Sequence, residues 1–169
     1  GHGQCGDGAA SNRSGWRMVG WQSYEGIQED QRIYKNGRKI VQIAGTVNGQ
    51  DSTAITYYTL TDDGRLWGWG YNGYGQTATN NATTNSAETY SPHQCNREGL
   101  PSRGESGIVP VTDAVYVTAA CDQYGTVWYI DTAGKVWAAG RNNNYPMGDA
   151  YGNNQAYFRP VQHGSSACA

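Results

Sequence analysis

Three short stretches in the first half of the chain have the apolar and polar spacing of β-strands. Residues 39–44 alternate polar and apolar side chains, residues 54–60 are β-branched and aromatic, and residues 65–69 include two tryptophans. Such alternation and enrichment are typical of half-buried strands. Between the last two stretches lies an Asp-Asp-Gly triplet whose glycine, Gly64, can adopt a positive φ without steric cost. The pattern predicts one strand followed by a β-hairpin.

The same order of elements returns over residues 114–120, 125–130 and 135–140. Residues 1–4 also match residues 73–76, which predicts that the chain opens with the tail of a third, partial copy. A repeat of this kind indicates a scaffold built from identical supersecondary units. Three pairs of residues, each pair 70 positions apart, are expected to be structural: Gly64 and Gly134, Trp67 and Trp137, and Gly70 and Gly140.

The clearest copy, residues 59–76, reads Thr-Leu-Thr-Asp-Asp-Gly-Arg-Leu-Trp-Gly-Trp-Gly-Tyr-Asn-Gly-Tyr-Gly-Gln. This block resembles the repeat of the regulator of chromosome condensation family. The resemblance implies an all-β fold of β-propeller-like blades with antiparallel strands, in two complete repeats and a partial one with long inserted loops. The expected divisions of one structural unit are residues 1–38 (tail of a preceding repeat and connector), 39–112 (first repeat, with a long loop at 77–108) and 113–169 (second repeat and C-terminal tail).

Two repeats are too few for a stable stack, because a single blade cannot bury both of its faces and at least about three repeats are generally needed. We therefore expect the chain to pack against further blades. These come either from other copies of the chain, such as a homotrimer that closes a six-bladed ring, or from further repeats of a longer polypeptide.

The composition narrows the range of partners. Charged residues make up 15% of the chain and the net charge is −2, which argues against a nucleic-acid partner. No apolar run approaches the roughly 20 residues that cross a bilayer, so membrane insertion is not expected. An even number of cysteines in a polar chain favours disulfides and an extracellular or virion-surface location. The four disulfide candidates are Cys5, Cys95, Cys121 and Cys168; we favour Cys5–Cys95 with Cys121–Cys168, and four reduced thiols remain the alternative.

Motifs that carry catalytic chemistry are weak in this sequence. Two Gly-x-Gly-x-x-Gly strings, at residues 1–6 and 68–73, are not followed by a helical pattern, so no nucleotide cofactor is predicted. His2, His93 and His163 share no metal-ligand spacing, so no metal site is predicted. No nucleophile elbow and no paired carboxylates indicate an active site. We predict a protein that is not an enzyme.

The loops after the two hairpins are rich in Tyr, Asn and Gly, the residue types that dominate adaptable binding surfaces. Tyrosine offers a rigid amphipathic ring and asparagine offers hydrogen bonds, a combination that also suits sugar rings. Loops that are only soluble connections remain the alternative interpretation. The candidate ligand-binding residues are Tyr71, Tyr74, Tyr90, Asn142, Asn143, Tyr145 and Tyr151.

These observations favour a non-enzymatic recognition module of the tail-fibre or adhesin type, which binds a cell-surface glycan or protein through these loops. The alternative is a secreted propeller that binds or inhibits a partner protein, as propeller-type β-lactamase inhibitors similar to this family do. The family also implies guanine-nucleotide exchange on a small GTPase. The slightly acidic balance and the lack of a basic tail argue against that role.

Overall fold

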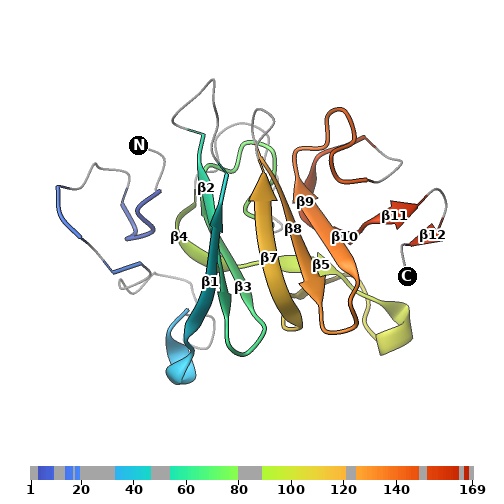
Figure 1. Ribbon diagram of the computed structural model, residues 1–169, viewed down its shortest axis with the longest axis horizontal. Coiled ribbons are helices and arrows are strands. Elements are labelled where there is room, and N and C mark those ends of the chain that lie inside the picture. The colour runs from blue at the N-terminus through green and yellow to red at the C-terminus, as the bar shows by residue number, and fades with distance from the viewer. Residues whose placement is uncertain are drawn as a thin grey trace.

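The computed structural model describes residues 4–9, 14–16, 18–19, 33–46, 54–79, 89–120, 125–148, 152–163 and 166–167. Strands dominate these residues, which contain two short 3-10 helices, η2 (Lys35–Gly37) and η3 (Pro101–Arg103), and no α-helix. None of the described helices has the length and apolar character that a membrane crossing requires. Two sheets stand next to each other, with β1 of one sheet beside β7 of the other (Figure 1).

The first sheet has four antiparallel strands in the order β1-β2-β3-β4. Its strands are β1 (Ile40–Gly45), β2 (Thr56–Thr61), β3 (Leu66–Gly70) and β4 (Thr89–Gln94). The predicted strand and hairpin are therefore confirmed, with boundaries shifted by one or two residues. Gly64 has a φ of 79° in the turn between β2 and β3, which explains why this turn ends in glycine.

The second sheet has the order β6-β5-β10-β9-β8-β7. Its strands are β5 (Asn96–Glu98), β6 (Ile108–Pro110), β7 (Ala114–Ala120), β8 (Thr126–Asp131), β9 (Val136–Gly140) and β10 (Gln155–Pro160). A separate two-stranded ribbon consists of β11 (Gln162–His163) and β12 (Ser166–Ala167). Strands β7, β8 and β9 repeat β1, β2 and β3, so the chain holds two blades of the expected all-β, propeller-like kind.

The expectation of a long loop over residues 77–108 was wrong for residues 89–108, which contain β4, β5 and the first residue of β6; residues 80–88 lie outside the described residues. The Asn, Ser and Pro content of this segment is typical of a loop, but pairing decides its conformation. Strand β4 completes the first sheet, where Gln94 pairs with Trp67 of β3. Strand β5 then leaves the first sheet and runs parallel to β10, with Arg97 opposite Phe158. The chain thus crosses from one sheet to the other between β4 and β5.

The two repeated tryptophans are buried and are held in the same way. The indole Nε1 of Trp67 donates to Thr61 Oγ1 at 3.3 Å, and that of Trp137 donates to the equivalent residue, Asp131, at 3.1 Å. A guanidinium lies over each ring: Arg38 over Trp67 at 5.6 Å, and Arg97 over Trp137 at 5.2 Å from the ring centroid. A desolvated cation over an indole is favourable. Both tryptophans are therefore part of the scaffold, as the repeat predicts.

Cys95 lies at the crossing between the sheets and has no access to solvent. Its N–H donates to Leu66 O at 2.8 Å, its carbonyl accepts from Val111 N at 2.9 Å, and its Sγ lies 3.3 Å from Thr77 O. Cys5 is exposed on the N-terminal segment, and both thiols are free. The predicted Cys5–Cys95 disulfide is therefore wrong, because the contacts that hold Cys95 enclose its thiol between the sheets. Cys121 and Cys168 lie outside the described residues.

The two thiols should differ sharply in reactivity. Burial raises the pKa of the Cys95 thiol, so both access and ionisation oppose its attack on an alkylating reagent. In the native protein at pH 8, iodoacetamide should label Cys5 within minutes and leave Cys95 unlabelled, and denaturant should expose Cys95. Peptide mass spectrometry measures both sites. Equal labelling of the two cysteines before denaturation would contradict this account of the crossing.

Gly64 and Gly134 occupy the same place in the two repeats, but only Gly64 lies against the segment that leads into the second sheet. A Cβ at Gly64 would lie 2.8 Å from Thr112 O in the segment before β7, whereas a Cβ at Gly134 would have no atom of the described residues within 4 Å. Both residues have positive φ, at 79° and 78°, so the backbone penalty of alanine is the same. Gly64→Ala should therefore destabilise the protein by about 1–3 kcal/mol more than Gly134→Ala, measured by urea unfolding. Equal losses would show that the turn of the first sheet does not press on the second.

Candidate ligand-binding face

The loops that follow β3 and β9 are held by the same set of hydrogen bonds. In the first loop the side chain of Asn72 is buried and its Oδ1 accepts from Thr77 N at 3.0 Å. In the second loop Asn142 is buried in the same way and its Oδ1 accepts from Met147 N at 3.2 Å. In each loop the side-chain carbonyl of asparagine accepts a hydrogen bond from a backbone N–H. This bond fixes the turn, which lies outside the strand pairing of the sheets.

The backbone of the two loops repeats as well. Gly75 N donates to the carbonyl of Asn72 at 3.1 Å, and Tyr145 N donates to the carbonyl of Asn142 at 3.0 Å. A threonine also holds the carbonyl of the first residue of each loop. Thr56 Oγ1 donates to Tyr71 O at 2.6 Å, and the equivalent Thr126 Oγ1 donates to Arg141 O at 2.7 Å. The shape of both loops is therefore fixed by the scaffold rather than by a ligand.

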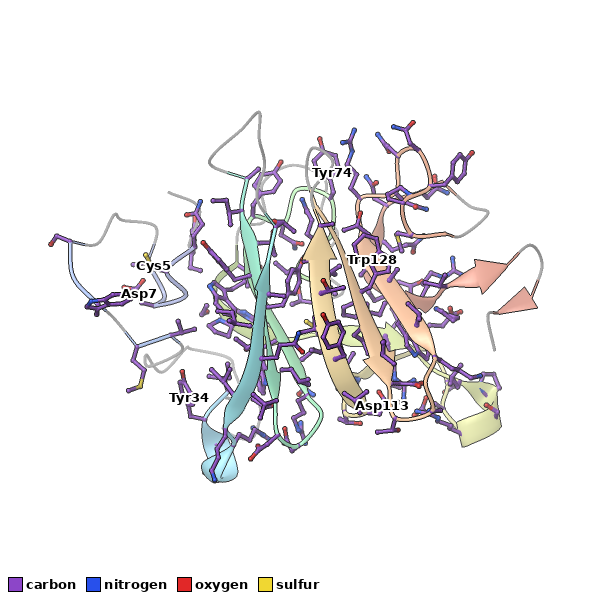
Figure 2. All side chains as sticks on the ribbon, viewed as in Figure 1. Cys5, Asp7, Tyr34, Tyr74, Asp113 and Trp128 are labelled. Carbon is purple, nitrogen blue, oxygen red and sulfur yellow. The ribbon has the colours of Figure 1, made fainter. Side chains whose placement is uncertain are left out.

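The two loops lie close to each other at the same end of the sheets. The guanidinium of Arg141 lies 5.7 Å from the ring centroid of Tyr74, so the second loop contacts the first directly. Within the first loop, the rings of Tyr71 and Tyr74 are 6.4 Å apart. We call residues 71–79 and 141–148 together the loop face. Figure 2 labels Tyr74 at the upper end of the molecule, where this face lies.

The structure sorts the predicted loop residues by exposure. Tyr145 is 60% exposed, and Asn143 beside it is also exposed. Tyr71 and Tyr74 are half-buried, and Asn142 is fully buried, so Asn142 maintains the turn instead of presenting its amide on the surface. Sequence reasoning did not single out Asn144, which is exposed between Asn143 and Tyr145; the Asn-Asn-Asn run of residues 142–144 was the available signal.

Two of the predicted residues are not part of the loop face. Tyr90 belongs to the edge strand β4, is partly exposed, and its carbonyl accepts from Gly8 N at 2.9 Å. Tyr151 lies outside the described residues. The face is therefore built from the residues that immediately follow the two hairpins.

Charged side chains gather at the other end of the sheets. Arg97 forms two hydrogen bonds with the Glu105 carboxylate, at 2.7 and 2.8 Å, and Arg103 pairs with Asp113 and Asp131. Figure 2 labels Asp113 at the lower end, opposite Tyr74. The molecule is therefore polarised, with a structural ion-pair network at one end and a loop face at the other whose polar groups, apart from Arg141, are neutral.

The glycines of the string at residues 68–73 have a structural role in the packing of the backbone. A Cβ at Gly68 would lie 2.6 Å from Thr77 O, and one at Gly70, where φ is 104°, would lie 2.4 Å from Ile55 O. These glycines allow close approach of neighbouring chain segments, and the string leads into the loop rather than into a helix. Among the residues that the structure describes, no three metal-ligating side chains gather. His93 contacts the carbonyl of Ser91 through Nδ1 at 2.9 Å.

Comparison with known proteins agrees with this geometry. The profile of the regulator of chromosome condensation (RCC1) repeat matches residues 58–76, so the chain carries a repeat of this family. Human WBSCR16 is similar over 97% of this chain and 33% of its own, with 19% identity and a TM-score of 0.56. Yeast RCC1 (Prp20), in a structure with Kap60, covers 78% of this chain and 27% of its own, with 19% identity and a TM-score of 0.47.

The chain therefore spans about a third of the length of the solved structures that it resembles. At these identities the likeness to WBSCR16 establishes the fold and nothing about activity. No curated protein matches the chain.

The ion-pair network makes a pH-dependent contribution to stability. The hydrogen bond from Arg97 lowers the pKa of Glu105 to about 2, with help from Leu100 N. A carboxylate with a depressed pKa stabilises the fold above its unfolded pKa, and this contribution is lost as the pH falls toward 2. Glu105→Gln should therefore cost about 1–3 kcal/mol at pH 7, measured by urea unfolding. The difference from the unmodified protein should shrink between about pH 5 and pH 2; a constant difference would contradict a role for the charge.

Proposed function

We propose that this chain, which carries a repeat of the regulator of chromosome condensation family, is a non-enzymatic recognition module whose loop face binds a glycan. The observation that carries the proposal is the pairing of the two loops. Two turns with matching hydrogen bonds, one from each blade, place Tyr71, Tyr74 and Tyr145 on the loop face together with the exposed amides of Asn143 and Asn144. Tyrosine and asparagine are well suited to such contacts, because the ring gives area at low entropic cost and the amide gives hydrogen bonds.

The charge distribution supports a neutral ligand. The acidic side chains of the described ion-pair network lie at the far end of the sheets, and the loop face contributes the single cation of Arg141, which lies over the Tyr74 ring. A sugar ring offers C–H groups to an aromatic face and hydroxyls to amides, so it matches a face of this kind. An extended basic surface, which a nucleic-acid partner would require, is absent from the described residues of the loop face.

We further propose an extracellular or virion-surface location, as in a tail fibre or an adhesin. The low share of charged residues and the neutral polar loops support this placement. The free thiols of Cys5 and Cys95 remove one of the reasons for it, so the proposal rests on the character of the loop face.

A printed array of neutral oligosaccharides tests the binding. The unmodified chain should bind a subset of the array, and Tyr74→Ala should weaken that binding by about tenfold or more, because the ring bridges both loops. Thr132→Ala is the matched control, since Thr132 is exposed on the turn at the opposite end, and it should bind like the unmodified chain. Absence of binding to every glycan, or equal losses in both variants, would refute the proposal. Capture of a protein by the same face would favour the alternative of a propeller that binds a partner protein.

A further inference from the structure

The first loop of the loop face also joins the two sheets. A Cβ placed on Gly75 would lie 2.7 Å from Ala156 Cα and 2.9 Å from Gln155 O, both in the backbone of β10. No side chain fits between backbones at such distances, and the φ of Gly75 is +80°. The same segment continues to Ala78, which is buried in the core and accepts from Asn96 N at 2.7 Å. We call residues 75–78, with their contacts on the second sheet, the inter-sheet joint.

A second contact of this kind lies between the innermost strands. The side-chain amide of Gln42 in β1 donates to Val117 O at 2.6 Å, and its Oε1 accepts from Val117 N at 3.1 Å. The side chain of Gln42 thus pairs with the free edge of β7 as a neighbouring strand would. Gly75 and Gln42 thus make two of the contacts between the first sheet and the second, in addition to the turn at Gly64 that lies against Thr112.

The N-terminal segment makes a related contact on the first sheet. Trp69 Nε1 donates to Gln4 O at 3.0 Å. Gly6 occupies the same place in the repeat as Ala78, and the two have similar φ values of +64° and +53°. A Cβ on Gly6 would touch the Trp69 indole at 2.8 Å. The end of one repeat therefore packs on the next sheet twice in the chain.

The second loop keeps the turn of the joint but not its contact residue. Its backbone hydrogen bonds match those of the first loop, yet Tyr145 stands where Gly75 stands in the first. Tyr145 has a φ of +60° and Asn144 before it has a φ of +66°, a region that L-residues disfavour. Tyr116 follows the bulge in β7 as Gln42 follows the bulge in β1, and Tyr116 is 48% exposed. At the positions that correspond to Gly75 and Gln42, the second blade therefore has tyrosines, Tyr145 and Tyr116.

We propose that Tyr145 converts the second loop from a blade joint into a ligand-binding loop, in which its ring is the platform for a neutral sugar ring. This inference rests on the proposed function and assigns its main contact. The ring is 60% exposed and lies against Gly152, where an added Cβ would come within 3.0 Å of Tyr145 Cε1. A fixed turn therefore presents the ring before any ligand arrives, which lowers the entropic cost of binding. Asn143 and Asn144 stand beside the ring with exposed amides.

The presence of Tyr145 at the place of Gly75 also affects how further sheets could pack against this chain. A second sheet that docked on this loop as β10 docks on Gly75 would meet the Tyr145 side chain instead of bare backbone. A homotrimer that closes by repetition of the inter-sheet joint therefore requires a glycine at position 145. The exposed second loop is better explained as a binding surface than as an unfilled joint.

Stability and binding should move in opposite directions when Tyr145 is replaced. Tyr145→Gly removes both the ring and the unfavourable φ, so its melting temperature should rise, while its signal on the array of neutral oligosaccharides should fall by about tenfold or more. Tyr145→Phe keeps the ring and should bind within about threefold of the unmodified chain. Thr132→Ala, on the exposed turn at the opposite end of the sheets, is the control, and it should melt and bind like the unmodified chain.

Two results would overturn the role of Tyr145 and leave the proposed function standing: Tyr145→Gly binds the array as the unmodified chain does, or it melts lower than the unmodified chain, which would make Tyr145 a packing residue. Failure of the unmodified chain to bind any neutral oligosaccharide would overturn the proposed function and the platform together. The unmodified chain therefore tests the proposed function, and the comparison of Tyr145→Gly with Tyr145→Phe tests the role of the Tyr145 ring.

Discussion

Neither sheet of this chain can bury both of its faces alone, and the inter-sheet joint is a contact at which the backbones of the two sheets meet beside their common core. The joint depends on close approach of backbones: Gly75 lies against Ala156 with no room for a side chain, and Ala78 enters the core between the sheets. Close-packed contacts of this kind tolerate little added volume. The crossing at Cys95 adds a second constraint, because β4 ends in the first sheet and β5 begins in the second within one residue.

The joint also explains why the loops are well placed for recognition. Since the sheets are held side by side, the turns that follow β3 and β9 lie next to each other, and Arg141 of one contacts Tyr74 of the other. Buried asparagines, Asn72 and Asn142, fix both turns from inside. The buried scaffold residues thus fix the backbone of both loops, and the exposed side chains are free to vary. This division is common where function lies on loops that a rigid fold positions.

Much of the scaffold could be predicted because its signals are local. Gly64 and Gly134 mark tight turns, and the strands on either side of each turn have the β-branched and aromatic content that a hairpin needs. Strands β4 to β6 could not be predicted in the same way, because their sequence is typical of a loop and only pairing with β3 and β10 makes them strands. Long-range pairing also determines the state of Cys95, which it buries as a free thiol between the sheets while Cys5, its predicted disulfide partner, is exposed on the N-terminal segment.

The candidate site was predictable in its location but not in the role of each residue. Composition pointed to the loops after both hairpins, yet it could not distinguish Asn142, which faces inward, from Asn143, which faces outward, because both belong to one run of asparagines. Nor could it show that Gly75 and Tyr145, which the repeat aligns, differ in their surroundings: Gly75 lies against the backbone of β10, and Tyr145 is exposed. That difference depends on contacts between segments far apart in the chain, which the sequence does not display.

Native-state amide hydrogen exchange tests most directly whether the two sheets form one body. Tyr58 in β2 and Tyr129 in β8 are fully buried in the common core, one in each sheet. If the sheets depend on each other, the amides of both strands exchange through the same global opening, with free energies that agree within about 0.5 kcal/mol. Exchange of the β8 amides at an opening free energy several kcal/mol below that of the β2 amides would contradict the account, because the second sheet would then unfold while the first remained intact.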